Sequence, residues 1–206
     1  MKDKFLELSE EKKQKMINAA MEVFGKYKYR HASCNEIAAK AGISKGLLFY
    51  YFDNKKSLYL YTYQFCLDLM IRFSSQKDLL LCDDFFDILE YGIQKKAELM
   101  YHYPFLMEFS MRAYSSQGEE VDQEVTQDIM SKMPALYELY FSHVKMEKFK
   151  AGIDPFYILQ MMVWMSDGYL HTKEIMQEPM DIDEMMMEFH KWEELFLPMV
   201  YKEEYL

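Results

Sequence analysis

The sequence predicts an all-α fold, and three observations support this. The 206 residues include only 7 glycines and 5 prolines, which favours long helices over a turn-rich β fold. Half of the residues are hydrophobic and 28% are charged, a composition typical of a globular chain with a substantial core. Apolar residues also recur every three or four positions after residues that commonly begin helices.

The first expected helix begins after Ser9, a favourable N-cap that is followed by two glutamates at the positive end of the helix. The helix extends to about Gly25. The apolar residues that repeat at helical spacing within it are Ile17, Ala20, Met21 and Phe24.

Two short helices follow. Ser33, with Glu36 three residues later, forms a capping box for a helix over 33–40, and Gly42 ends it. Ser44 caps the next helix, whose buried side carries Leu48 and Phe52, and a long helix begins at Asn54. A helix, a glycine-containing turn and a second helix within about 22 residues have the layout of a helix-turn-helix.

The second of these short helices carries residues suited to DNA on the side away from its buried face. Lys45, Gly46, Leu47 and Tyr50 lie on that side, and Phe49 lies at its edge. The bare pattern leaves an alternative open, because a short amphipathic helix in a three-helix bundle does not require DNA.

The charge distribution favours the DNA interpretation. The whole chain has a net charge of -10, but residues 1–60 carry 12 basic and 7 acidic residues, a net charge of +5. Residues 61–206 carry 12 basic and 27 acidic residues, a net charge of -15. Only the N-terminal region can therefore approach phosphates at low electrostatic cost.

The segment INAAMEVFGKYKYRHASCNEIAAKAGISKGLLFYYFDNKKSL, residues 17–58, resembles the DNA-binding domain of the TetR family of bacterial repressors. The resemblance rests on the AAxxxF, EIAxxAGIS and KGLLFYYFxxKxxL patterns, and it covers about the first 60 residues. Two positions depart from the family pattern, since Leu47 and Phe49 replace the usual threonine and tyrosine. The resemblance implies DNA contacts by Ser33, Asn35, Ser44, Lys45, Gly46, Leu47, Phe49, Tyr50, Tyr51 and Lys55.

We therefore expect an N-terminal three-helix DNA-binding domain with a helix-turn-helix over residues 1–54. A C-terminal helical domain for ligand binding and dimerisation is expected over residues 55–206. Breaks at prolines and glycine-containing turns predict helices in the C-terminal domain at 54–76, 83–101, 104–116, 119–148, 154–177 and 181–204.

The resemblance implies a small-molecule pocket in the C-terminal domain. Fifteen of the 19 methionines lie from residue 100 onward, and methionine suits adaptable apolar surfaces, although any single methionine more often fills a core. The expected pocket residues, chosen by helix position, are Tyr103, Met107, Met111, Tyr114, Met133, Tyr137, Phe141, Met161 and Trp164. The acidic composition of this domain favours a neutral or cationic ligand over an anion. No cofactor or metal site is expected.

The last two long helices are expected to form a homodimer. Phe189, Trp192, Phe196, Met199 and Val200 make an apolar stripe, and the resemblance implies a four-helix interface built from these two helices of each subunit. The stripe could equally pack within the monomer. Dimerisation is favoured because two half-sites need two recognition helices.

The favoured function is a dimeric transcriptional repressor that leaves double-stranded operator DNA when a small, largely apolar effector binds. The alternative is a DNA-binding regulator without such an effector, controlled by a protein partner. An enzyme is disfavoured, because no nucleophile with a base, paired acids or metal cluster is visible. The absence of an apolar N-terminal segment and of a membrane span, with three unpaired cysteines, predicts a cytoplasmic protein.

Overall fold

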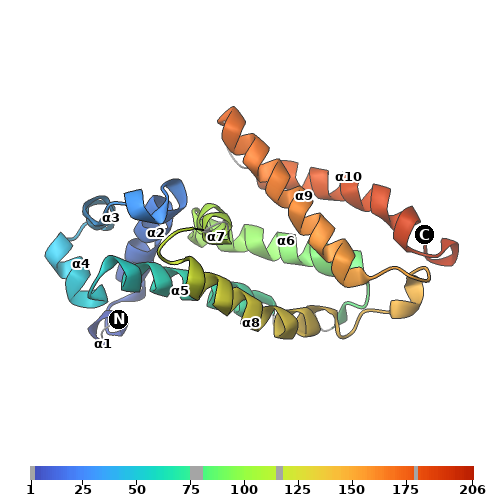
Figure 1. Ribbon diagram of the computed structural model, residues 1–206, viewed down its shortest axis with the longest axis horizontal. Helices are drawn as coiled ribbons and strands as arrows, with labels where there is room; N and C mark the ends of the chain where they lie inside the picture. Colours follow the sequence, from blue (N-terminus) through green and yellow to red (C-terminus); the bar gives the residue numbers. More distant parts are fainter. Residues whose placement is uncertain (1–2, 75–80, 115–117, 179–180) are drawn as a thin grey trace. The chain divides into compact units, whose positions relative to one another are not determined.

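The computed structural model describes residues 3–74, 81–114, 118–178 and 181–206, and it confirms the all-α prediction. Figure 1 labels the α-helices. Short 3-10 turns lie at Tyr29–His31, Met146–Lys148 and Glu203–Tyr205. The described ranges contain no strand, only one isolated antiparallel bridge. None of their helices is long and apolar enough to cross a bilayer. The α-helices are α1 (Asp3–Leu6), α2 (Glu10–Lys26), α3 (Cys34–Ala41), α4 (Lys45–Phe52), α5 (Lys55–Ser74), α6 (Phe85–His102), α7 (Leu106–Tyr114), α8 (Asp122–Phe141), α9 (Pro155–Met176) and α10 (Ile182–Val200).

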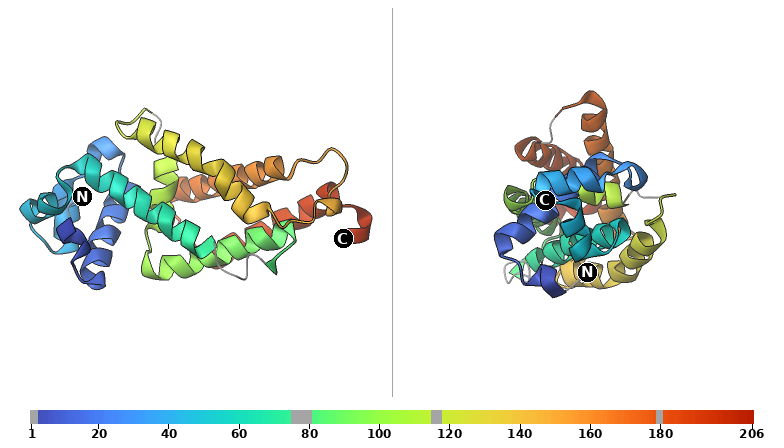
Figure 2. Two further views of the ribbon diagram at one scale, coloured as in Figure 1. Left: turned by 90° about the horizontal axis from the view of Figure 1, so that it is seen from below. Right: turned by 90° about the vertical axis from the view of Figure 1, so that its left-hand side faces the viewer.

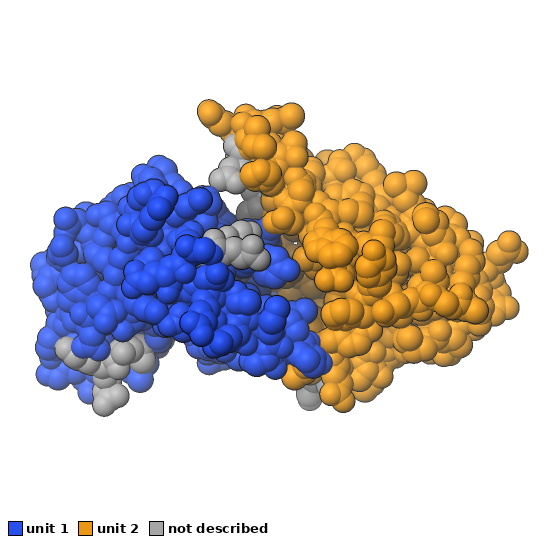
Figure 3. All heavy atoms as spheres, viewed as in Figure 1, with its two compact units in different colours: residues 1–73, 98–134 blue, residues 74–97, 135–206 orange. Residues whose placement is uncertain are grey.

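The chain forms two compact units, coloured separately in Figure 3. Unit 1 comprises residues 1–73 and 98–134, and unit 2 comprises residues 74–97 and 135–206. Unit 1 therefore holds α1 to α5 up to residue 73, the C-terminal end of α6, α7 and the first part of α8. The functional boundary expected after residue 54 concerns DNA binding and stays a prediction.

The N-terminal helices begin and end largely where their local signals place them. The Ser44 hydroxyl accepts a hydrogen bond from the Leu47 backbone N–H at 3.1 Å, and the Asn54 side-chain oxygen accepts one from Ser57 at 2.8 Å. Gly42 ends α3 in the left-handed region, with φ 71°. Ser9 does occupy the N-cap position of α2, but its side chain makes no capping hydrogen bond.

The core of unit 1 is built on the residues that the helical periodicity identified. The α2 residues Ile17 and Phe24 and the α4 residues Leu48 and Phe52 are at most 1% exposed. Phe5 of α1 is also fully buried, with its ring centroid 4.7 Å from that of Phe52. The sequence did not reveal this contribution, because α1 has only four residues and shows no periodicity.

The core of unit 2 includes Tyr201, which follows the last long helix. Tyr201 is buried and pairs with Phe149 in the antiparallel bridge, and its hydroxyl donates a hydrogen bond to Asp84 at 3.1 Å. Lys148 forms an ion pair with the same carboxylate at 2.7 Å. The first turn of α6 is thereby tied to both the 145–150 segment and the C-terminus.

Two helix predictions in the C-terminal region were wrong in their ends. The helix expected over 119–148 stops at Phe141, because the chain turns to bury Val144 and Phe149 in the core of unit 2. The helix expected to reach residue 204 stops at Val200, since Tyr201 is extended and forms the bridge. The ends predicted at 76 and 116 lie outside the described residues.

Candidate nucleic-acid interface

The helix-turn-helix is formed by α3, the turn at Gly42 and α4. The backbone N–H of Ile43 donates to the Ala38 carbonyl at 3.0 Å, which closes the end of α3 and directs the chain into α4. Helix α3 packs on both α2 and α4, so the three helices form one body within unit 1 (Figure 1). This packing fixes which side of α4 faces solvent.

The solvent-facing side of α4 carries the residues expected there. Lys45 and Gly46 are exposed, and the side chains of Leu47 and Tyr50 are 37% and 40% exposed. Phe49 lies partly buried at the edge, with the Lys45 ammonium 5.8 Å from its ring centroid. Within the described parts of α2, α3 and α4, Leu47 and Tyr50 are the only large hydrophobic residues that reach such exposure.

Tyr51 does not share that surface. Its side chain is only 8% exposed, and its ring packs against those of Phe5 and Tyr50 at centroid distances of 6.0 and 5.5 Å. Of the two adjacent tyrosines, Tyr50 alone presents its ring to solvent. Lys4 of α1 lies beside it, and a hydrogen bond with Tyr50 raises the pKa of this lysine. Sequence reasoning missed Lys4 because α1 carries no recognisable pattern.

Cationic side chains gather around the N-terminus of α3. Burial raises the pKa of the Cys34 thiol, and the nearby ammonium groups of Lys55 and Lys45 oppose that effect. Asn35, the next residue, is exposed. Candidates from α3, α4 and α5 therefore meet on one side of unit 1. The Ser33 and Ser44 hydroxyls both accept backbone hydrogen bonds as helix caps, which gives them a structural role.

The two lysines at the start of α5 have different partners. The Lys55 ammonium lies 4.6 Å from the centroid of the Tyr29 ring, and no carboxylate pairs with it among the described residues. Lys56 instead forms an ion pair with Glu124 of α8 at 2.5 Å and donates to the Glu120 carbonyl at 3.3 Å. Lys55 is therefore available to an external anion, whereas Lys56 holds α5 to the start of α8.

Helix α2 connects α3 and α4 to the end of α6 and to α7 within unit 1. The side chains of Gln14 and Asn18 both donate to the His102 carbonyl, at 2.9 and 3.0 Å. The Arg112 guanidinium donates to the Gly25 carbonyl at 3.0 Å. A Cβ atom at Gly25 would lie 3.1 Å from the Phe109 backbone nitrogen, so α2 and α7 approach each other closely at this glycine.

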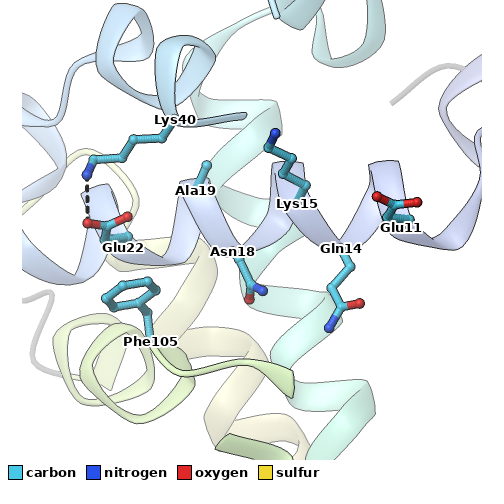
Figure 4. Close-up of a pocket in the computed structure, with 8 residues that line it drawn as sticks. All are labelled: Glu11, Gln14, Lys15, Asn18, Ala19, Glu22, Lys40 and Phe105. Atoms are coloured by element: carbon cyan, nitrogen blue, oxygen red, sulfur yellow. Dashed lines mark hydrogen bonds and ion pairs between the residues drawn. The ribbon is translucent and has the colours of Figure 1, made fainter. Parts of the chain in front are cut away.

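A surface pocket of about 350 Å³ opens on the same side of α2 (Figure 4). An ion pair between Lys40 and Glu22 at 2.6 Å crosses one end of it. Its lining is Glu11, Gln14, Lys15, Asn18, Ala19, Glu22, Lys40 and Phe105. This lining is mostly polar and includes none of the residues expected around an apolar effector.

The residues expected to line the effector pocket are divided between the two units. Tyr103, Met107, Met111, Tyr114 and Met133 belong to unit 1, and Tyr137, Phe141, Met161 and Trp164 belong to unit 2. Met107 is buried, whereas Tyr114 and Trp164 are 56% and 50% exposed. A pocket formed by these residues stays a prediction.

Helices α9 and α10 expose several large apolar residues, and Met199 of the expected stripe is one of them. Phe189, Phe196 and Val200 lie in the core of unit 2, so this part of the expected dimer stripe packs within the chain. A Lys173–Glu184 ion pair and a contact between the Tyr169 and Trp192 rings hold α10 to α9. The ribbons of these two helices are the orange and red ones in Figure 2. The exposed large hydrophobic residues of these helices are Phe156, Tyr157, Val163, Trp164, Ile175, Met176, Met187, Leu195 and Met199.

Comparison with known proteins finds a family match in the N-terminal region and similarity to a transcriptional regulator over most of the chain. Residues 16–62 match the model of the bacterial regulatory proteins of the tetR family. The HTH-type transcriptional regulator RutR of Escherichia coli O157:H7 is 28% identical over 158 residues, which cover 75% of this chain and 71% of RutR.

Two solved regulators share the fold. The fatty acid degradation regulator FadR from Bacillus halodurans matches with a TM-score of 0.64 and 18% identity, over 86% of this chain and 95% of FadR. SmeT, the repressor of the Stenotrophomonas maltophilia multidrug efflux pump SmeDEF, matches with a TM-score of 0.58 and 20% identity, over 91% and 89% of the two chains. At these identities, the likeness concerns the fold alone.

Proposed function

We propose that this chain is a TetR-family transcriptional regulator, a dimeric repressor that a small, largely apolar ligand releases from operator DNA, because residues 16–62 match that family and RutR is similar over most of the chain. The observation that carries the proposal is the surface of α4. Leu48 and Phe52 anchor this helix in the core, while its opposite side exposes Lys45 and Tyr50. The ammonium groups of Lys45 and Lys55 both lie near the Cys34 thiol at the start of α3.

On DNA, α4 would occupy the major groove as the recognition helix. The Lys45 ammonium can donate hydrogen bonds to the O6 and N7 atoms of guanine. Gly46 lacks a side chain, so the helix backbone can approach the DNA closely there. Lys55 supplies a cation for a phosphate, and exposed Asn35 at the start of α3 supplies a neutral donor and acceptor.

Dimerisation would use the exposed apolar face of α9 and α10. On α9, Tyr157, Trp164 and Ile175 recur at helical spacing along one side, with exposed Gly168 between them. No atom lies within 4 Å of the Cβ position at Gly168, so a partner helix could approach closely there. Burial of this face would hold two copies of α4 at the fixed separation that two half-sites require.

Release from DNA would proceed through the contacts between α2 and α7. A ligand that shifts α6 or α7 would also move α2, since Gln14 and Asn18 hold the His102 carbonyl and Arg112 holds that of Gly25. The ligand must favour the form in which the two recognition helices are wrongly spaced. A preference of about 100-fold, roughly 2.7 kcal/mol, lies within the usual range of coupling energies.

The proposal can be tested by titrating a complex of the protein and a fluorescently labelled operator with apolar compounds. We expect at least one compound to lower operator affinity while leaving non-specific DNA binding unchanged. A compound that binds tightly to the protein without changing operator affinity would contradict the release mechanism.

A further inference from the structure

Helix α1 is anchored to the helix-turn-helix region by one side chain. Phe5 of this helix is fully buried. Its ring packs against three aromatic rings of α4 and α5, at centroid distances of 4.7, 5.3 and 6.0 Å from Phe52, Tyr61 and Tyr51. Helix α1 therefore lies against the end of α4 and the first part of α5 (Figure 1). Because a helix of four residues is not stable alone, this packing fixes its position.

Lys4, the residue before Phe5, lies outside that aromatic core. Its side chain is exposed, and its ammonium lies 5.5 Å from the centroid of the Tyr50 ring. A hydrogen bond with Tyr50 raises the pKa of Lys4, and Glu7 adds a smaller effect in the same direction. Among the described residues, no carboxylate forms an ion pair with Lys4. The packing of Phe5 thus holds a charged ammonium beside Tyr50.

Tyr50 belongs to the solvent-facing side of α4, where it is 40% exposed. Lys45, the proposed base-reading residue, lies on the same side of the helix, so an anion at Tyr50 would border the groove that α4 enters. The Tyr50 oxygen accepts a hydrogen bond from the Lys4 ammonium, and this polarises the tyrosine O–H and makes it a stronger donor. An ammonium and a polarised hydroxyl side by side suit the oxygens of a phosphate.

We propose that Lys4 and Tyr50 together bind one phosphate of the DNA backbone, with the Lys4 ammonium supplying the charge and the Tyr50 hydroxyl a hydrogen bond. The inference rests on the proposed DNA-binding function and adds α1, which lies outside the helix-turn-helix, to the interface. A phosphate contact carries no sequence information, so this pair positions α4 on the duplex and does not read bases.

The test measures the affinity of the full-length protein for its operator and for a random duplex of the same length, by fluorescence anisotropy over a range of salt concentrations. Lys4→Met should weaken binding to both duplexes by about two- to fivefold at physiological salt, the range of an exposed ion pair. It should also reduce the slope of log K against log salt by about 1. Lys4→Arg keeps the charge and should keep both quantities. Lys202→Met is the matched control, since it removes an exposed lysine of unit 2 and should change neither.

A combined variant shows whether the two side chains share one phosphate. Tyr50→Phe should weaken binding to both duplexes without changing the salt slope, because it removes a hydroxyl and no charge. Lys4→Met and Tyr50→Phe together should cost less than the product of the two single losses, since each change already weakens the same contact.

Phe5→Ala tests whether the packing of α1 places the ammonium. It should lower Tm, because it removes a buried ring, and it should reduce the salt slope as Lys4→Met does. A Phe5→Ala protein with a lower Tm and an unchanged slope would refute the role of this packing.

An unchanged salt slope in Lys4→Met, with wild-type affinity for the operator above that for random DNA, would overturn the role of Lys4 and leave the proposed DNA-binding function standing. Equal changes in Lys4→Met and Lys202→Met would reveal a general effect of net charge and would also overturn it. Fully multiplicative losses in the combined variant would contradict a shared phosphate. Wild-type protein that binds the operator no better than random DNA would contradict the proposed repressor, and a failure to bind either duplex would overturn the Lys4 inference with it.

Discussion

The helices of the helix-turn-helix region, α2 to α4, and the last two helices, α9 and α10, differ in how many large apolar residues they expose to solvent. In the described parts of α2, α3 and α4, only Leu47 and Tyr50 are large, hydrophobic and exposed, and both lie on the proposed recognition surface. Helices α9 and α10 expose nine such residues, including Trp164 and Leu195. The first region completes its core within one chain, whereas the second leaves an apolar face uncovered.

This difference separates what one chain can do alone, which is to present a recognition surface, from what would require a second copy, which is to space two such surfaces. The recognition surface needs only the three-helix body, because Leu48 and Phe52 already fix the orientation of α4. In the proposed dimer, the spacing of the two recognition helices would depend on a second copy, which would bind through the apolar face of α9 and α10. Substitutions on α9 and α10 should therefore change the oligomeric state, whereas substitutions on the exposed side of α4 should change DNA recognition alone.

The largest effect is expected from Trp164→Glu on α9. A carboxylate in the centre of the apolar face would oppose its burial, so the protein should sediment as a monomer. Operator affinity should fall by about 100-fold or more, since each half-site would be bound separately. Analytical ultracentrifugation and fluorescence anisotropy measure the two effects.

Met130→Glu provides the control for this change. Met130 is 71% exposed on α8, away from α9 and α10 in the chain, and its replacement should leave both sedimentation and operator affinity unchanged. A Trp164→Glu protein that remains dimeric would contradict the assigned interface. Deletion of α10 would be a poorer test, because it also removes Phe189 and Val200 from the core of unit 2.

The close approach of α2 and α7 can be tested with Gly25→Val. The added atoms would press on the Phe109 backbone nitrogen and should lower the free energy of unfolding by about 1–3 kcal/mol. Gly92→Ala, also in a helix but with open space at its Cβ position, should instead raise it by about 0.5–1 kcal/mol. Urea denaturation measures both changes, and effects of the same sign would refute the proposed difference between the sites.

Lys45→Ala tests sequence recognition by α4. Loss of its contact should cost about 1–3 kcal/mol of discrimination at one base position and leave binding to random DNA nearly unchanged. Anisotropy measurements on operators with single base changes would show this. An equal loss of affinity for operator and random DNA would assign Lys45 to the phosphates instead.

The smallest effects should distinguish the two lysines at the start of α5. Lys55→Ala should weaken binding to every sequence and reduce the slope of log K against log salt by about 1, because one phosphate contact is lost. Lys56→Ala should leave that slope unchanged and slightly lower stability, since Lys56 pairs with Glu124. If both variants change the salt slope equally, the division of roles between them is wrong.

The sequence predicted the helices of the helix-turn-helix region well because its signals are local. Ser44, Gly42 and Asn54 each act on residues within one helical turn, and Leu48 with Phe52 marks the buried side directly. The exposed side of α4 follows from the same periodicity. These features require no knowledge of distant segments.

Predictions failed where distant segments decide the structure. The end of α8 depends on the burial of Phe149 against Tyr201, more than fifty residues further along the chain. Phe189 and Met199 look equivalent in an apolar stripe, yet one is 3% and the other 66% exposed, because only tertiary packing distinguishes their faces.

The most direct measurement is a footprint of the purified full-length protein on the DNA that flanks its own coding region. We expect one protected segment that contains two symmetric half-sites, and the centres of the half-sites should lie about one helical turn of DNA, or a multiple of it, apart. It also predicts that Trp164→Glu abolishes this protection at the same protein concentration. Protection no stronger than on random DNA, or an unchanged footprint from a monomeric Trp164→Glu protein, would contradict a regulator that binds its operator through two recognition helices.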